Sequence, residues 1–172
     1  CTSALAASDY SSDNVTGGNT PGSMGVGVAA AYYHFSSNRN YKDDNHVTPL
    51  VTLNYNIDSV YGVQALFGRL VSTDSSNDKN VGGWLAIIDG VYRFSNMPAL
   101  HLQPYAVAGL GVTTMKESGS GQHRPANVNG GVGIQYFISS TMSFDASLRD
   151  VYTFSHKKNE YMAALGLNIL FN

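Results

Sequence analysis

The sequence predicts an all-β protein, an eight-stranded antiparallel up-and-down transmembrane β-barrel. Eight segments alternate apolar residues with small or polar residues at a period of two, which is the pattern of a strand with one face in lipid. Long and short connections alternate between these segments, as in a barrel whose strands run up and down. Only 13% of the residues are charged, about half of the usual share, so little charge is available for a water-facing surface.

Length and composition exclude several other classes of protein. The 172 residues suit one domain, and a net charge of −2 with a pI near 6.2 gives no reason to expect nucleic acid as a partner. No apolar run reaches the roughly 18 residues that a membrane-spanning helix needs. The mean hydropathy of −0.12 agrees with strands whose two faces average out.

The start of the chain is polar and has almost no period. Residues 1–23 are therefore expected to form a flexible leader, and residues 24–172 the barrel. The single cysteine, Cys1, cannot form an internal disulfide. It is either a lipid-modified N-terminus or, with Ala4-Leu5-Ala6 close behind it, part of a signal-peptide remnant. Both interpretations indicate an exported protein.

The first four strands are expected at residues 24–35, 47–57, 60–71 and 81–94. The first alternates glycine and alanine with valine and tyrosine, and the second alternates large apolar residues with threonine and asparagine. A tight turn at Asp58-Ser59 leads into the third strand, whose aromatic and aliphatic residues lie opposite glycine and glutamine. The fourth strand has aromatic residues outward and two charged residues, Asp89 and Arg93, inward.

The last four strands are expected at residues 100–112, 128–137, 142–152 and 161–171. The fifth and sixth alternate aliphatic residues with glycine and glutamine, and the seventh has Asp145 and Arg149 on its polar face. The closing strand has only apolar residues on the face that runs from Tyr161 to Phe171. Its length of roughly 33 Å, tilted near 40°, projects to about 25 Å, the height of the apolar band of a membrane barrel.

Two prolines fit these strands poorly, because proline has no N–H to donate to a sheet ladder. Pro49 stands near a strand start, which is tolerable. Pro104 stands inside the fifth strand and predicts a bulge or a missing ladder hydrogen bond.

Outward aromatic residues gather at two levels, which is typical of the two girdles of a membrane barrel. The girdle near the long loops consists of Tyr32, Trp84, Tyr152 and Tyr161, and the girdle near the short turns consists of Tyr55, Tyr61, Tyr92, Tyr136, Phe144 and Phe171. In bacterial barrels short turns face the periplasm and long loops face outward.

A polar network is predicted inside the lumen. Its members are Asp89, Arg93, Asp145, Arg149, Gln64 and Gln135. Buried charges need partners, so the two arginines are expected to pair with the two aspartates. Such pairs either gate a narrow pore or plug it. The plug is favoured, because eight strands leave an interior just wide enough for side chains.

Three stretches resemble the N-terminal barrel of OmpA/OprF-type outer-membrane proteins: Ile87–Val112, with Asp89-Gly90-Val91-Tyr92-Arg93-Phe94; Gly131–Phe137; and Tyr161–Leu167. The resemblance covers residues 24–171 and implies a non-enzymatic anchor in the outer membrane of a Gram-negative bacterium, at most a narrow channel. In that family a separate periplasmic domain usually follows and grips peptidoglycan, and we expect that domain to be absent from these residues.

Two other classes of protein remain as alternatives. A soluble lipocalin-like barrel would need an apolar lumen and a charged outside, the reverse of the faces assigned here. A lipid A-modifying barrel enzyme is suggested by His34-Phe35-Ser36, which is similar to the His-x-Ser of an outer-membrane deacylase, but no carboxylate is placed to orient the histidine. The histidines lack ligand spacing, so we expect no catalytic residue, no metal and no cofactor.

The expected partners follow from the outer face and the loops. They are outer-membrane lipid, lipopolysaccharide and the barrel-assembly machinery, which would read the terminal aromatic strand, with peptidoglycan reached only through a further domain. Basic residues in the long loops make adhesion or phosphate binding an alternative to simple solvation.

Overall fold

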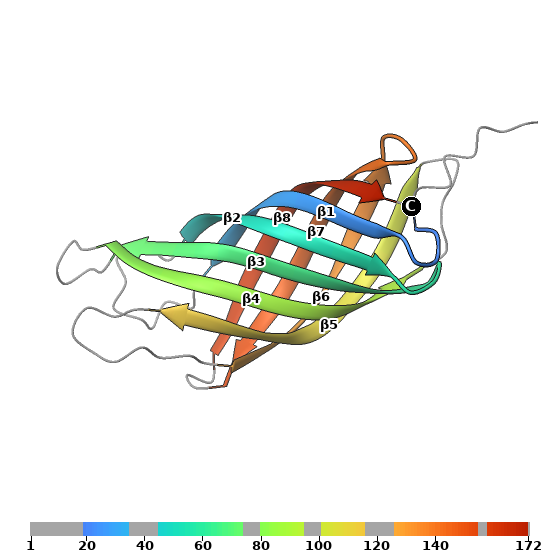
Figure 1. The fold of residues 1–172 in the computed structure, drawn as a ribbon. Coiled ribbons are helices and arrows are strands. Elements are labelled where there is room, and N and C mark those ends of the chain that lie inside the picture. The colour runs from blue at the N-terminus through green and yellow to red at the C-terminus, as the bar shows by residue number, and fades with distance from the viewer. Residues whose placement is uncertain are drawn as a thin grey trace, which may run out of the picture.

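The computed structural model describes residues 19–34, 45–73, 80–94, 101–115, 126–154 and 158–171. Eight strands form one closed barrel in chain order, and every neighbouring pair is antiparallel (Figure 1). The strands are β1 (Met24–His34), β2 (Asn45–Asn56), β3 (Tyr61–Thr73), β4 (Asn80–Arg93), β5 (Leu102–Met115), β6 (Ala126–Phe137), β7 (Met142–Thr153) and β8 (Lys158–Phe171). The predicted fold class is confirmed.

Several strands are longer than the hydrophobic pattern predicts. β3 and β4 remain paired as far as Thr73 and Asn80, and β8 begins at Lys158 instead of Tyr161. A sheet ladder needs only backbone groups, so it continues past the positions where one face turns polar. Strand ends beyond the apolar band are therefore not visible in the alternation.

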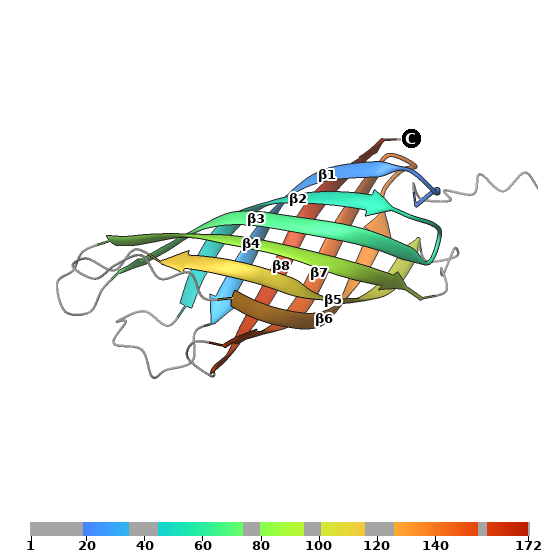
Figure 2. The ribbon, with the colours of Figure 1, turned by 60° about the horizontal axis from the view of Figure 1, so that its bottom comes forward.

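The connections do not alternate strictly in length, so that expectation is wrong. The β7–β8 connection, residues 154–157, is as short as the turn at residues 57–60, and residues 94–101 make β4–β5 longer than predicted. Both ends of the described chain nevertheless lie at one end of the barrel, with the turns at 57–60 and 138–141 (Figures 1 and 2). We call this the short-turn end and the opposite end the loop end.

The two faces of the barrel are sorted as predicted. Large apolar side chains such as Leu110 and Leu165 are about two-thirds exposed on the outside, at 67% and 68%. Large side chains that alternate with outward residues, such as Ile87 and Met162, point inward and are buried. No helix in the described parts of the chain is long and apolar enough to cross a membrane. The apolar outside is the reverse of a soluble lipocalin-like barrel.

Pro104 causes no bulge. The β5–β6 register runs without interruption from Leu102 opposite Tyr136 to Val112 opposite Ala126. The Pro104 carbonyl accepts the N–H of Phe94 at 3.0 Å, one residue past the end of β4. Because the N–H and C=O of a strand residue point to the same neighbour, the missing donor faces the point where β4 has ended. The hydrogen bond that Pro104 cannot donate would therefore lie just beyond the end of the β4–β5 ladder.

Pro49 lies at a similar ladder end. The β2–β3 register stops at Leu50 opposite Gly68, so Pro49 is the first residue beyond it. β2 continues from there paired with β1 alone. Neither proline interrupts a central ladder.

The turn at residues 57–60 is held by Asp58. Its carboxylate accepts the N–H groups of Tyr61 at 2.6 Å and Val60 at 2.7 Å. These two hydrogen bonds, the one from Tyr61 first, lower the pKa of Asp58 below its ordinary value. An aspartate two or three residues before such N–H groups is a local turn signal, which the sequence shows.

The predicted leader is too long, because residues 19–23 are part of the folded structure. Thr20-Pro21-Gly22-Ser23 forms a turn in which the Ser23 N–H donates to the Thr20 carbonyl at 3.0 Å. Pro21 suits the second position, and Gly22 takes φ = 82° at the third, as a type II turn requires. The rest of the predicted leader, with Cys1, lies outside the described residues.

Candidate functional site

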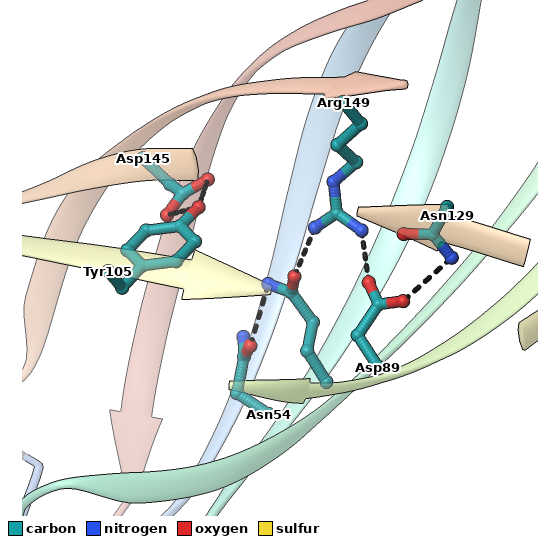
Figure 3. Close-up of polar contacts among 7 residues, drawn as sticks. Asn54, Asp89, Tyr105, Asn129, Asp145 and Arg149 are labelled. Atoms are coloured by element: carbon teal, nitrogen blue, oxygen red, sulfur yellow. Dashed lines mark hydrogen bonds and ion pairs between the residues drawn. The ribbon is translucent and has the colours of Figure 1, made fainter. Parts of the chain in front are cut away.

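The centre of the lumen holds a buried ion pair between Arg149 on β7 and Asp89 on β4 (Figure 3). The two side chains are 1% and 0% exposed. The other Asp89 oxygen accepts a hydrogen bond from Asn129 at 2.9 Å, and Arg149 also donates to Gln64. Gln64 in turn donates to Asn54 at 2.9 Å. This chain of contacts crosses the lumen from β7 to β2 and gives both charges partners.

Glycines on the neighbouring strands make room for this pair. Gly109 is opposite Asp89 on β5, and Gly131 is opposite Arg149 on β6. A Cβ on Gly131 would lie 2.8 Å from Cγ of Arg149, closer than side-chain carbons approach. The small residues on the lumen face therefore determine where the large charged side chains lie.

The predicted pairing of Arg93 with Asp145 is not formed among the described residues. Arg93 donates from Nη2 to Asn56, and Nη1 has no hydrogen-bond partner. Asp145 accepts the hydroxyl of Tyr105, at 2.9 and 2.8 Å from its two oxygens (Figure 3). Tyr105 can reach Asp145 because Gly133, opposite it on β6, leaves space for the ring. The strand register alone does not show that the Tyr105 hydroxyl contacts Asp145.

Gln135, the last predicted network member, lies nearer the short-turn end. It donates to Ser143 at 2.8 Å and accepts from Asn19 at 3.3 Å. The six predicted residues are therefore all on the lumen side, but they divide into four local groups. Asp89 and Gln64 contact Arg149, whereas Arg93, Asp145 and Gln135 each have partners outside the predicted set.

The loop-end half of the lumen contains an apolar cluster that the sequence interpretation missed, beside buried polar residues such as Thr48, Asn127 and Thr153. The large buried side chains of this cluster are Tyr33, Leu50, Leu66, Leu85, Ile87, Val151 and Met162. We call these seven residues the apolar layer. All are at most 3% exposed and pack against one another. The signal in the sequence is Trp84-Leu85-Ala86-Ile87-Ile88, a continuous apolar run where one-faced burial would give alternation.

Glu160 was missed as well, because it precedes the predicted start of the closing strand. Its side chain is buried at the loop end and accepts the Tyr33 hydroxyl at 3.3 Å. The inward parity of β8, continued two residues upstream of Met162, would have predicted it.

A small cavity remains between the Arg149 group and the short-turn end. Its volume is about 20 Å³, and its lining includes Arg93, Asp145, Tyr105 and Asn19. This is close to the space that one water occupies, and polar side chains surround it. The described residues contain no group of three side chains suited to holding a metal ion.

The predicted girdle residues all lie on the outside at the predicted strand ends. Tyr61 and Tyr92 have ring centroids 5.6 Å apart at the short-turn end, and Trp84 stacks on Phe67 at 5.1 Å near the loop end. Such clusters of outward rings suit the interface between hydrocarbon and headgroups. Of the suggested enzymatic pair, His34 ends β1 and Ser36 lies outside the described residues.

Comparison with known proteins gives consistent matches. Residues 6–172 match the family described as the OprF membrane domain. Outer membrane porin F of Pseudomonas aeruginosa is 30% identical over 106 residues, which cover 58% of this chain and 30% of that protein. The chain thus spans less than a third of the length of this curated relative.

Solved structures share the fold. The N-terminal β-barrel domain of Pseudomonas aeruginosa OprF has a TM-score of 0.67 at 23% identity, covering 88% of this chain and 98% of that one. The attachment invasion locus protein Ail of Yersinia pestis, in complex with the heparin analogue sucrose octasulfate, has a TM-score of 0.62 at 16% identity, covering 88% and 100%. OprG of Pseudomonas aeruginosa has a TM-score of 0.61 at 12% identity, covering 90% and 98%.

Proposed function

Because the chain belongs to the OprF membrane-domain family, we propose that it is a non-enzymatic anchor whose lumen is sealed against water and ions. It is a porin-like barrel of the outer membrane of a Gram-negative bacterium. Whether this barrel conducts ions or acts only as an anchor depends on what fills its lumen.

One observation supports a sealed lumen: two different groups of buried side chains occupy the lumen, one after the other along its axis. At mid-depth the Asp89–Arg149 pair and its amide partners occupy the cross-section. Toward the loop end the apolar layer follows, and apolar constrictions exclude water even where a space is left. An ion would have to break a buried ion pair and then pass the apolar layer.

Planar-bilayer conductance of the purified barrel tests this proposal. The unmodified barrel is expected to stay closed. The double variant Asp89→Ser/Arg149→Ser should conduct little more, because the apolar layer remains. Adding Tyr33→Ala and Met162→Ala should open a measurable pore, which also proves that the assay detects an opened barrel. A large steady conductance of the unmodified barrel would replace the anchor with a channel.

The partners are part of the proposal. The outward apolar face would contact outer-membrane lipid and lipopolysaccharide, and β8, ending at Phe171, would be recognised by the barrel-assembly machinery. Peptidoglycan would be reached only through a further domain, as the greater length of the curated relative suggests.

Adhesion through the loops is a second candidate. The first support is that the chain shares its fold with Ail, a likeness that shows the fold alone. The second is the positive charge of Arg39, Lys42, Lys116 and Arg124, which lie between the strands in the sequence. Binding of the purified barrel to sucrose octasulfate would support it if replacing these four residues by glutamine abolishes the binding. Equal binding by the variant would reject it.

A further inference from the structure

The short-turn end of the lumen is covered by a segment that is not part of the barrel wall. Residues 19–23 leave β1, and their turn brings the chain back over the mouth. Gly22 N–H donates to the Asn56 carbonyl at 2.8 Å, and Asn56 N–H donates to the Ser23 carbonyl at 2.9 Å. The Asn56 side chain also donates to the Ser23 hydroxyl at 2.7 Å. The turn is therefore fixed to the end of β2.

The turn places the side chain of Asn19 inside the mouth. Its carboxamide donates to Gln103 on β5 at 2.5 Å and to Gln135 on β6 at 3.3 Å, and Asn19 is only 9% exposed. Gln135 in turn donates a hydrogen bond to Ser143 on β7, which is completely buried. Asn19 thus links to three consecutive strands from a segment that precedes β1.

We propose that residues 19–23 are a latch that closes the periplasmic mouth of the lumen, separately from the Asp89–Arg149 pair and the apolar layer. The latch is held by a handful of hydrogen bonds between neutral groups, each contributing about 0.5–1.5 kcal/mol, whereas the barrel wall is held by continuous ladders. Segments with few contacts open locally while the rest of a protein stays folded. The mouth therefore opens by release of Asn19, with no change in the barrel wall.

Opening the latch exposes a defined set of groups. The cavity of about 20 Å³ behind Asn19 is lined by Arg93 and Asp145, so periplasmic water reaches these two charges when the latch is released. The ion pair at mid-depth does not line this cavity, because Gln64 and Asn54 lie between the cavity and Arg149. The latch thus controls access to the lower lumen only.

A thiol reporter beneath the latch tests the proposal. In full-length protein with Cys1→Ser, the nearly isosteric change Ser143→Cys places the thiol at a buried site, next to Gln135, which accepts a hydrogen bond from Asn19. We expect slow reaction with a bulky, membrane-impermeant thiol reagent. Adding Asn19→Ala or Gly22→Val should raise the rate about tenfold or more, because each removes roughly the free energy that corresponds to a factor of ten.

The two latch variants act by different routes and have matched controls. A Cβ on Gly22 would meet no atom within 4 Å, so Gly22→Val acts only through the strain of a β-branched residue at φ = 82°. Gly22→Asn should leave the rate near that of the parent, because asparagine tolerates this conformation. Ser140→Ala, an exposed change at the same end, should also have no effect. Equal rates in all variants would overturn the latch.

The reporter separates this inference from the proposed function. Folding of each variant is checked by its heat-dependent mobility on gels, and conductance is measured on the same samples. The latch variants should stay non-conducting, because the two groups of buried side chains that occupy the lumen remain. Conduction by the unmodified barrel, together with a protected thiol in the Ser143→Cys reporter, would reject the sealed lumen and keep the latch.

Discussion

Asp89 and Arg149 depend on each other, because each is buried and each is the other's counter-charge. Asp89→Asn keeps the shape and the contact to Asn129 but leaves Arg149 without an opposite charge. We expect a loss of about 3–5 kcal/mol in the free energy of unfolding, measured by denaturant titration in detergent micelles.

The double variant Asp89→Asn/Arg149→Met is the control for that loss. It should be clearly more stable than Asp89→Asn alone, because removing both charges removes the unpaired one. A loss below about 1 kcal/mol for Asp89→Asn would mean that water reaches the arginine and that the lumen is not dry at this depth.

At the scale of single residues, the sequence predicts whether a side chain points inward or outward better than it predicts which side chain it contacts. The inward position of Arg93 follows from strand parity alone. Its contact with Asn56, near the end of β2, depends on the width and stagger of the barrel, which no local pattern encodes. Tyr105 likewise reaches Asp145 only because Gly133 leaves space.

Among the elements, β6 offers a direct comparison of the two faces. Gly130 points outward and Gly131 toward Arg149, so the same change can be made at neighbouring positions. Gly131→Ala should destabilise the barrel by about 1–3 kcal/mol, because the added Cβ would overlap the backbone carbonyl oxygen of Leu148 and crowd Cγ of Arg149. Gly130→Ala should be neutral or stabilising by up to about 1 kcal/mol, because its Cβ would meet no atom closer than 3.9 Å. Denaturant midpoints of both variants measure the difference, and equal losses would contradict the assigned faces.

The existence of each strand is predictable from the sequence, but the strand ends are not. All eight expected segments contain the observed strands in large part, because one face of each is apolar. The ends of β5 at Met115 and β8 at Lys158 lie where backbone pairing continues without apolar alternation. The turn at Thr20–Ser23 has a signal of its own, Pro-Gly, inside a stretch whose polar composition predicts flexibility.

For the whole molecule, the apolar outer face suits lipid, and not water, as the medium around the barrel. Leu165 lies in the middle of β8, between Ala146 and Ala30 on the neighbouring strands, and is 68% exposed. Leu165→Arg should destabilise the barrel by about 2–4 kcal/mol in lipid vesicles, because it places a charge near the bilayer midplane. Ser140→Arg, in an exposed turn, is the matched control, and equal tolerance of both changes would argue against lipid on this face.

The lumen as a whole was only half predictable. Charged inward residues in the fourth and seventh strands indicated a polar filling, and the structure has one at mid-depth. The apolar layer was hidden because its leucines and isoleucine alternate with outward residues that are apolar too, so the two faces look alike.

The seam between β1 and β8 has a consequence for how the barrel forms. Its register runs along the whole of β1, from Met24 opposite Phe171 to His34 opposite Tyr161, so the first and last strands close the sheet. Contacts at such sequence separation form slowly, because the chain between them must first be confined. Until β8 arrives, all eleven residues of β1 have an unpaired edge that another chain can extend. The interval before β8 pairs with β1 is therefore the stage at which this sheet, with two free edges, is most exposed to aggregation.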